Sequence, residues 1–391
     1  MFAKRTSWNL ETNRLSTALS AHQAAGKPFL DLTISNPTEC GFHYGQESIL
    51  AALRNPASLK YEPNPRGLAV ARNAVVEYYF RRNITIPPDD IFLGTSTSEA
   101  YSYVFRTLCD PGDNLLIPAP SYPLFEFLAD IQDVHLVRYP LFYDHGWHID
   151  FHAIEQAITP RTRGIIVVNP NNPTGNFFKP SEISKLSQIC VARDLAIIAD
   201  EVFLDFALKT DQPPSFAANS AVLTFTLSGI SKICGLPQMK VAWLILSGPQ
   251  REKTEASARI EVIADTFLSL NTPIQSALPT LLAQRHEFQE QLLARARQNL
   301  AELDRQLGLQ KSSSRLEVEG GWNTILRVPA TRSDEDLALE LLATKSVFVH
   351  PSHFYDFPSE GFLVLSLITP PVDFSEGISR LLAVFPSSDD L

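Results

Sequence analysis

Residues 163–201, RGIIVVNPNNPTGNFFKPSEISKLSQICVARDLAIIADE, carry the pattern that decides the fold. The stretch begins with a nearly continuous run of isoleucine and valine at 163–170, and a second apolar run follows at 195–203. Between the two runs, residues 181–194 place apolar side chains on one face of a helix. Two buried strands joined by a helix are typical of a parallel sheet, because parallel neighbours need a crossover connection.

The same alternation of apolar runs and helical patterns extends from about residue 65 to about residue 285. Several of the runs are almost wholly Val, Ile and Leu, which favours strands covered on both faces. We expect seven strands, at 90–94, 114–120, 134–140, 163–170, 195–203, 221–228 and 241–247. The predicted fold class is therefore α/β, with a mostly parallel seven-stranded sheet in a large domain.

A change of pattern toward the C-terminus predicts a second, smaller domain. Apolar residues keep helical spacing over about residues 273–307, so we expect a long helix that bridges the two domains. Beyond it, short strands and helices alternate in an α+β pattern. We expect a small α+β domain built from both chain ends, with 1–50 as an N-terminal arm and part of it, 51–285 as the large domain, and 286–391 as the rest.

Composition and charge argue against several classes of protein. The 391 residues are too many for one ordinary core, while 45% hydrophobic and 19% charged residues are usual for a soluble chain. A net charge of −10 argues against a general nucleic-acid binder and against binding to anionic membranes. No apolar run approaches the roughly 18–20 residues that cross a bilayer, and the N-terminus lacks the apolar core of a secretory signal.

The cysteines and the short motifs narrow the classes further. Cys40, Cys109, Cys190 and Cys234 are scattered, with no C-x-x-C pair among them. They suit the reduced thiols of a cytoplasmic protein better than disulfides or a zinc site, so we expect no metal. The sequence has no Walker loop, no H-E-x-x-H and no G-x-G-x-x-G motif.

Polar residues interrupt the apolar runs where three of the expected strands end. Asn172 comes just after the strand at 163–170, Asp200 ends the next strand, and Lys232 follows the strand at 221–228. In open α/β sheets, ligands bind beyond the carboxyl ends of the strands. Lys232 stands in a small and apolar stretch, where an ammonium is costly unless it is neutral, paired or used covalently. The pattern predicts an amide, a carboxylate and an amine in one site.

The order of these motifs resembles that of the class I/II aminotransferases, which belong to fold type I of the pyridoxal phosphate enzymes. The motifs are Asn-Pro-Asn-Asn-Pro-Thr-Gly at 169–175, Asp-Glu-Val at 200–202 and Ser-Gly-Ile-Ser-Lys at 228–232. The resemblance covers nearly the whole chain. It implies that Lys232 forms a Schiff base with the cofactor and shuttles the catalytic proton. It also implies that Asp200 binds the pyridinium nitrogen and that Asn172 binds the phenolate oxygen.

The resemblance also implies a phosphate site and a shared dimer interface. Ser96 and Thr97 match a strand-to-helix turn that cradles the cofactor phosphate, which is a natural anion site. Ser231 and Lys240 match positions near the phosphate, although the family usually has arginine in place of Lys240. Tyr61 matches a tyrosine that reaches the phosphate of a neighbouring subunit, so a homodimer with shared active sites is implied.

Two aromatic positions next to the cofactor follow from the same resemblance. Tyr122 matches the residue that stacks on the cofactor ring. Phe203 stands where the family usually has a tyrosine three residues after the aspartate, so one hydrogen bond to the phenolate is lost. We expect this loss to raise the pKa of the lysine–cofactor imine.

The departure with most bearing on the substrate is Val364, where the family carries an arginine that clamps the substrate carboxylate. A charged, two-pronged hydrogen bond of that kind is worth roughly 1.5–3 kcal/mol or more. Either the substrate lacks the carboxylate or another cation takes its place, and Arg14, Arg66 and His353 are the candidates. We expect Trp322 to belong to the core rather than to the pocket.

The expected activity is that of a pyridoxal phosphate-dependent aminotransferase, a transaminase that works by a ping-pong cycle with a small amino donor and a keto acceptor. The sequence names neither substrate. A lyase, decarboxylase or racemase on the same cofactor remains an alternative. A non-catalytic cofactor-binding module is a further alternative. We expect no nucleic-acid partner and no membrane partner.

Overall fold

A computed structural model describes residues 1–210, 212–268 and 270–385. Its largest element is an eight-stranded sheet in the order β2-β9-β8-β7-β6-β3-β4-β5. The five strands from β8 to β4 run parallel, whereas β9 is antiparallel to both of its neighbours. The strands are β2 (Ile91–Gly94), β3 (Asn114–Ala119), β4 (His135–Tyr143), β5 (Trp147–Ile149), β6 (Thr162–Val168), β7 (Ala196–Asp200), β8 (Thr224–Gly229) and β9 (Ala242–Ser247).

The observed sheet confirms the predicted fold class and adds one strand to it. The seven predicted strands correspond to β2, β3, β4, β6, β7, β8 and β9. The eighth, β5, is a short edge strand that folds back antiparallel on β4. It was not predicted because it has only three residues and one of them is exposed. The sequence therefore has no apolar run at this position.

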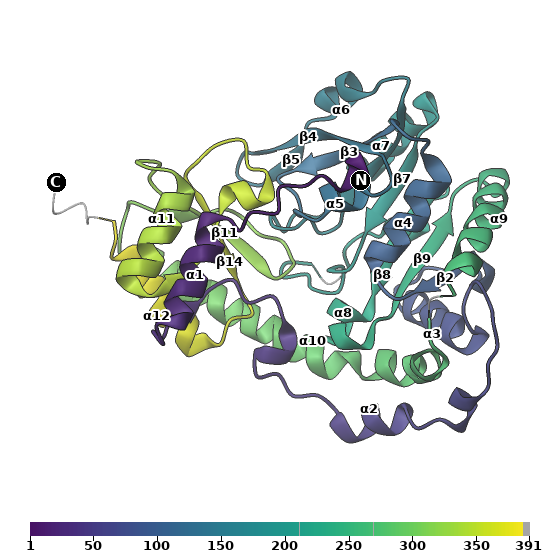
Figure 1. The fold of residues 1–391 in the computed structure, drawn as a ribbon, viewed down its shortest axis with the longest axis horizontal. Helices are drawn as coiled ribbons and strands as arrows, with labels where there is room; N and C mark the ends of the chain where they lie inside the picture. The colour runs from purple at the N-terminus through teal and green to yellow at the C-terminus, as the bar shows by residue number, and fades with distance from the viewer. Residues whose placement is uncertain (211, 269, 386–391) are drawn as a thin grey trace.

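Helices cover both faces of the sheet (Figure 1). In β2, Phe92 packs with α4 and α9 on one face, while Ile91 and Leu93 pack with α3 and α10 on the other. Both faces are apolar because both are buried, and each such side chain contributes roughly 1.5–3 kcal/mol. The helices around the sheet are α3 (Ala69–Phe80), α4 (Thr97–Leu108), α5 (Phe125–Asp130), α6 (Phe151–Ala157), α7 (Pro180–Arg193), α8 (Ile230–Ile233), α9 (Gln250–Phe267) and α10 (Thr272–Leu307).

The long helix α10 matches the bridging helix expected at about 273–307. It begins where the Asn271 side chain accepts a hydrogen bond from the backbone N–H of Ile274, with Pro273 in its first turn. One end packs against α3 beneath the large sheet, and the other packs against α12. Figure 1 shows it running along one side of the molecule between the two groups of elements.

The two chain ends pack together at the far end of α10, as expected. β1 pairs with β12, and residues from both chain ends share one apolar core. Figure 1 shows α1 beside α11 and α12. A four-stranded antiparallel sheet, in the order β10-β11-β14-β13, lies between this region and the large sheet. The elements are α1 (Arg14–Ala24), β1 (Leu30–Asp31), β10 (Ser314–Arg315), β11 (Asn323–Arg327), α11 (Asp334–Glu340), β12 (Val347–Phe348), β13 (His350–Pro351), β14 (Phe362–Ser366) and α12 (Pro371–Leu382). The remaining helix, α2 (Gln46–Ala52), packs instead against α10, where Ile49 joins the core beneath the large sheet.

The exact domain boundaries, at 50 and 285, stay a prediction. Among the described residues, no helix is both long enough and apolar enough to span a membrane.

Candidate active site

A cavity of about 300 Å³ opens at the carboxyl edge of the large sheet. Loops after β6, β7 and β8 and the start of α4 form one side, and β11, β13 and β14 of the small sheet contribute to the other. Seven of the nine predicted site residues line it: Ser96, Thr97, Tyr122, Asn172, Asp200, Ser231 and Lys232. The structure therefore brings most of the predicted site together, and leaves out Lys240 and Tyr61.

Strand order explains why residues far apart in the sequence meet here. β6, β7 and β8 are adjacent and parallel, and Asp200 lies between Val168 and Leu227 in the register. The segments that follow the three strands carry Asn172, Asp200 and Lys232, so the three polar groups emerge on the same edge.

Asp200 is a buried carboxylate with two hydrogen-bond donors. Its Oδ1 accepts from the backbone N–H of Val202 at 3.1 Å, and its Oδ2 accepts from the hydroxyl of Tyr101 at 3.0 Å. Burial raises the pKa of Asp200 to about 6, while these two hydrogen bonds and the charge of Lys232 oppose the rise. Asp200 is thus poised to pair with a cation, because ionisation without one is costly at this depth.

Tyr101 is a direct neighbour of the site that the sequence analysis missed. It lies in α4, is fully buried, and aims its hydroxyl at Asp200. Its only signal in the sequence is a spacing of four from Thr97, which puts both residues on the same face of the helix.

Lys232 lies in α8, the short helix that follows β8, and its amine faces an aromatic wall. The Nζ atom is 4.7 Å from the ring centre of Trp322 and 5.5 Å from that of Phe203. Burial lowers the pKa of Lys232 to about 8, although the charge of Asp200 raises it. A lysine that is neutral at a mildly basic pH is a nucleophile, whereas a solvated lysine remains an ammonium.

Trp322 differs from its prediction. It is buried, as expected, and packs edge-on against Phe203 and Phe206, but it also lines the cavity. Its indole N–H has no hydrogen-bond partner within the described part of the chain. The expectation that it belongs to the core alone is therefore wrong, because the core and the cavity share this ring.

Asn172 and the start of α4 supply neutral polar groups. The Asn172 side-chain oxygen accepts a hydrogen bond from the amide of Asn323 at 2.7 Å, which joins the two sides of the cavity. Ser96 caps α4, and its Oγ accepts from the backbone N–H of Glu99 at 3.1 Å. The cavity therefore meets the N-terminus of a 12-residue helix, where backbone N–H groups and the helix dipole favour an anion.

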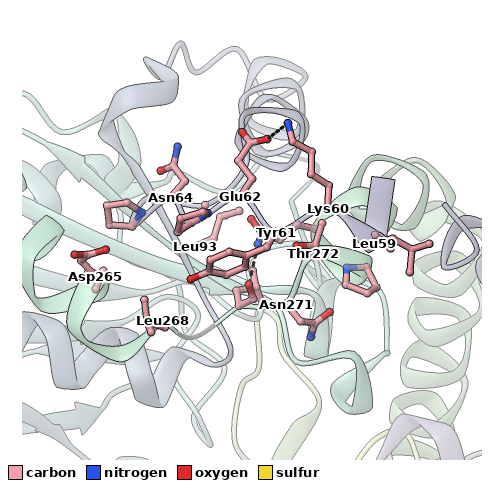
Figure 2. A pocket seen from close by; sticks show the side chains of 18 residues that line it. Leu59, Lys60, Tyr61, Glu62, Asn64, Leu93, Asp265, Leu268, Asn271 and Thr272 are labelled. Carbon is pink, nitrogen blue, oxygen red and sulfur yellow. Dashed lines mark hydrogen bonds and ion pairs between the residues drawn. The ribbon is translucent and has the colours of Figure 1, made fainter. Parts of the chain in front are cut away.

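Two predicted residues lie elsewhere. Lys240 is exposed, has a left-handed backbone conformation (φ 53°) after a short 3₁₀ turn, and does not line the cavity. Tyr61 is 76% exposed and lines a separate pocket of about 420 Å³. Figure 2 shows its ring reaching toward Leu268 and Asp265, away from the ion pair between Lys60 and Glu62. Within one chain, neither residue is part of the cavity.

Val364 on β14 is uncharged and buried, so it offers no cation to a substrate. Its side chain is 2% exposed and packs against Ile325 and Tyr355. No arginine among residues 1–210, 212–268 and 270–385 lines the cavity.

The three proposed replacements for the missing arginine lie outside the cavity, and two of them form ion pairs with other residues. Arg14 is exposed and pairs with two acidic residues of α11. Arg66 pairs with Glu261 at 2.6 Å and lies over the ring of Phe92. His353 is exposed, and none of the three lines the cavity. The structure instead brings His350 to the wall, three residues before the predicted histidine.

The chain belongs to the aminotransferase class I and II family, whose model matches residues 30–371. It is 32% identical over 260 residues to the glutamate-pyruvate aminotransferase AlaA of Escherichia coli, a match that covers 66% of this chain and 64% of that protein. It is 28% identical over 376 residues to the alanine aminotransferase of Mycobacterium tuberculosis, covering 92% and 86% of the two chains. The match therefore spans slightly less than two thirds of the Escherichia coli relative.

Solved structures share the fold over nearly the whole chain. The crystal structure of an aminotransferase from Escherichia coli superposes with a TM-score of 0.86 at 25% identity, covering 98% of this chain and 97% of that one. The alanine aminotransferase of Pyrococcus furiosus, at 23% identity, superposes with a TM-score of 0.88. The two groups of elements joined by α10 are thus arranged as in these two solved structures.

Proposed function

We propose that the protein is a pyridoxal phosphate-dependent aminotransferase acting on an amino acid or a related amine. The observation that carries this proposal is the meeting of an amine, a carboxylate, an amide and a helix N-terminus in one cavity. This set of groups fits the cofactor, which has an aldehyde, a ring nitrogen, a phenolate and a phosphate. When bound, the cofactor would supply the electron sink that lets a proton leave the carbon next to the substrate nitrogen.

Each of these groups has a part in holding the cofactor. Asp200 would balance the charge of the ring nitrogen, and its pKa of about 6 leaves it ionised at neutral pH. Asn172 would donate to the phenolate, held by its bond with Asn323. The start of α4, with Ser96 and Thr97, would bind the phosphate.

Lys232 would bind the aldehyde carbon and move the proton. Its lowered pKa makes Nζ both a nucleophile and, once released, a base for the substrate proton. The rings of Trp322 and Phe203 lie beside Nζ and restrict water there, and this burial lowers the pKa of the amine. Tyr122, Ser231 and the rest of the cavity wall would enclose the ring and the phosphate.

The proposal includes a homodimer. Tyr61 is exposed and lies in a pocket apart from the cavity, which suits a residue that serves the site of a second copy. Lys240, also exposed, would act near the phosphate only after some rearrangement of the loop that carries it.

The experiment that tests the proposal has two steps. Protein loaded with pyridoxal phosphate is reduced with borohydride, and the labelled peptide is mapped. We expect the label on Lys232, and a label elsewhere contradicts the assignment. The loaded protein is then mixed with single amino donors, alanine and glutamate among them, and we expect keto acid with conversion to the pyridoxamine form.

A lyase or decarboxylase on the same cofactor is the second candidate, which the uncharged Val364 favours. It would consume the donor without accumulating the pyridoxamine form, so the second step separates the two.

A further inference from the structure

The small sheet brings one histidine into the cavity. His350 on β13 lies directly across from Val364 on β14, and Ser366 on β14 lies across from Asn323 on β11. Val364 and Ser366 are two residues apart, and opposite residues in an antiparallel pair point the same way, so all four side chains share one face. His350, Ser366 and Asn323 line the cavity, and Asn323 contacts Asn172. The face therefore looks onto the proposed cofactor site.

Neighbouring side chains fix the orientation of the His350 ring. Its Nδ1 lies 3.1 Å from the hydroxyl of Tyr355, and its ring packs at 5.6 Å from that of Phe354 and at 5.9 Å from that of Phe348. No described residue forms a hydrogen bond with its Nε2. When Tyr355 donates to Nδ1, the proton of the neutral ring resides on Nε2, which becomes a free donor.

Apart from Lys232, no positively charged side chain among the described residues lines the cavity, so an anionic substrate group needs another donor. Lys232 is committed to the cofactor in the proposed function, and no described arginine reaches the cavity. The side of the cavity formed by the small sheet holds asparagine, serine, tyrosine, Trp322 and His350. His350 is therefore the one titratable nitrogen of that side within the described chain.

We propose that His350 is the residue that recognises the carboxylate of the substrate, through a single hydrogen bond from Nε2. The proposal rests on the aminotransferase function proposed above. A single bond from an imidazole holds a carboxylate less tightly than a two-pronged guanidinium does. The site therefore accepts α-amino acids but discriminates only weakly against amines that lack the carboxylate.

The test compares alanine with ethylamine, which differ only in the carboxylate. His350→Ala is expected to lower kcat/KM for alanine about tenfold, the cost of one lost hydrogen bond, mostly through KM. Its kcat/KM for ethylamine stays unchanged. His350→Gln, which keeps an N–H donor, restores part of the alanine rate. The exposed neighbour His353 provides the matched control, because His353→Ala leaves the ratio of the two substrates unaltered.

A binding measurement separates recognition from catalysis. 2-Methylalanine has the amine and the carboxylate but no proton to lose, and its dissociation constant from the loaded protein is read from the visible absorbance. His350→Ala is expected to raise this constant about tenfold, with the melting temperature within about 2 °C of the wild type.

The other possible outcomes distinguish a failure of the His350 proposal from a failure of the proposed aminotransferase function. If the wild type converts alanine but His350→Ala affects alanine and ethylamine equally, or affects neither, the role of His350 is disproved and the aminotransferase stands. If the wild type converts neither alanine nor ethylamine nor any other amino donor tested, the aminotransferase itself is disproved.

Discussion

The two sides of the cavity are built in different ways. On one side, Asp200 ends the strand β7, and Asn172 and Lys232 lie a few residues beyond the adjacent parallel strands β6 and β8. On the other side, His350 and Asn323 project from the face of a small antiparallel sheet, between strands that are distant in the sequence. We infer that the first side carries the chemistry, because it follows central strands of the large sheet, and the second carries the selectivity, because its side chains can vary without disturbing that sheet.

The largest expected effect tests the strand-end side. Lys232→Ala removes the nucleophile and the proton shuttle, so we expect kcat to fall by about 10⁴-fold or more, as when a covalent catalyst is deleted. The unfolding temperature should stay the same or rise, because a buried amine no longer loses its hydration on folding. Stopped-flow turnover and thermal melts measure the two quantities, with Lys311→Ala as the control, because Lys311 is exposed and does not line the cavity.

A clear loss of melting temperature without a loss of turnover would contradict this division of roles. It would mean that Lys232 supports the fold rather than the reaction.

An intermediate effect is expected at Tyr101 of α4, whose hydroxyl donates a hydrogen bond to Asp200. Tyr101→Phe removes one donor, so the pKa of Asp200 rises further above about 6. Asp200 loses its charge as the pH falls through this pKa, so the acidic limb of the kcat/KM profile moves to higher pH. At pH 7 we expect kcat/KM to fall about tenfold and the cofactor to bind less tightly.

Tyr139→Phe is the matched control for that prediction, because Tyr139 is also fully buried and donates its hydroxyl to a carbonyl in the sheet, at Ile166. It should lower stability by a similar amount and leave the pH profile in place. A profile of Tyr101→Phe that coincides with that of the wild type would remove Tyr101 from the site.

The smallest expected effect lies where the two sides touch. Phe203 follows β7 and packs edge-on against Trp322, which belongs to the opposite side. Phe203→Tyr adds a hydroxyl that can donate to the cofactor phenolate, so the pH midpoint of the visible absorbance should fall by about one unit. An absorbance titration of the loaded variant against the wild type measures it. An unchanged or higher midpoint would show that the hydroxyl does not reach the phenolate.

The strand-end side was accessible from the sequence, and the small-sheet side was not. Asn172, Asp200 and Lys232 each follow an apolar run, so their placement needed only the rule that parallel strands end on one edge. His350 lies in the two-residue strand β13, which is too short to show an alternating pattern, and nothing near it in the sequence distinguishes it from His353. Tyr101 was missed, and Trp322 was assigned to the core alone. The reason is related, because a buried residue can pack in the core and also contact the site.

The sequence by itself determined the α/β class, the seven main strands, the long helix and the reactive groups at the strand ends. These features depend on local periodicity and on spacing along the chain, which a linear sequence records. Only the tertiary structure decided which residues face Lys232 from the other side, because the register between distant antiparallel strands and the packing of aromatic rings depend on long-range contacts. His350 reaches the cavity, and His353 does not, because the pairing of β13 with β14 places His350 there.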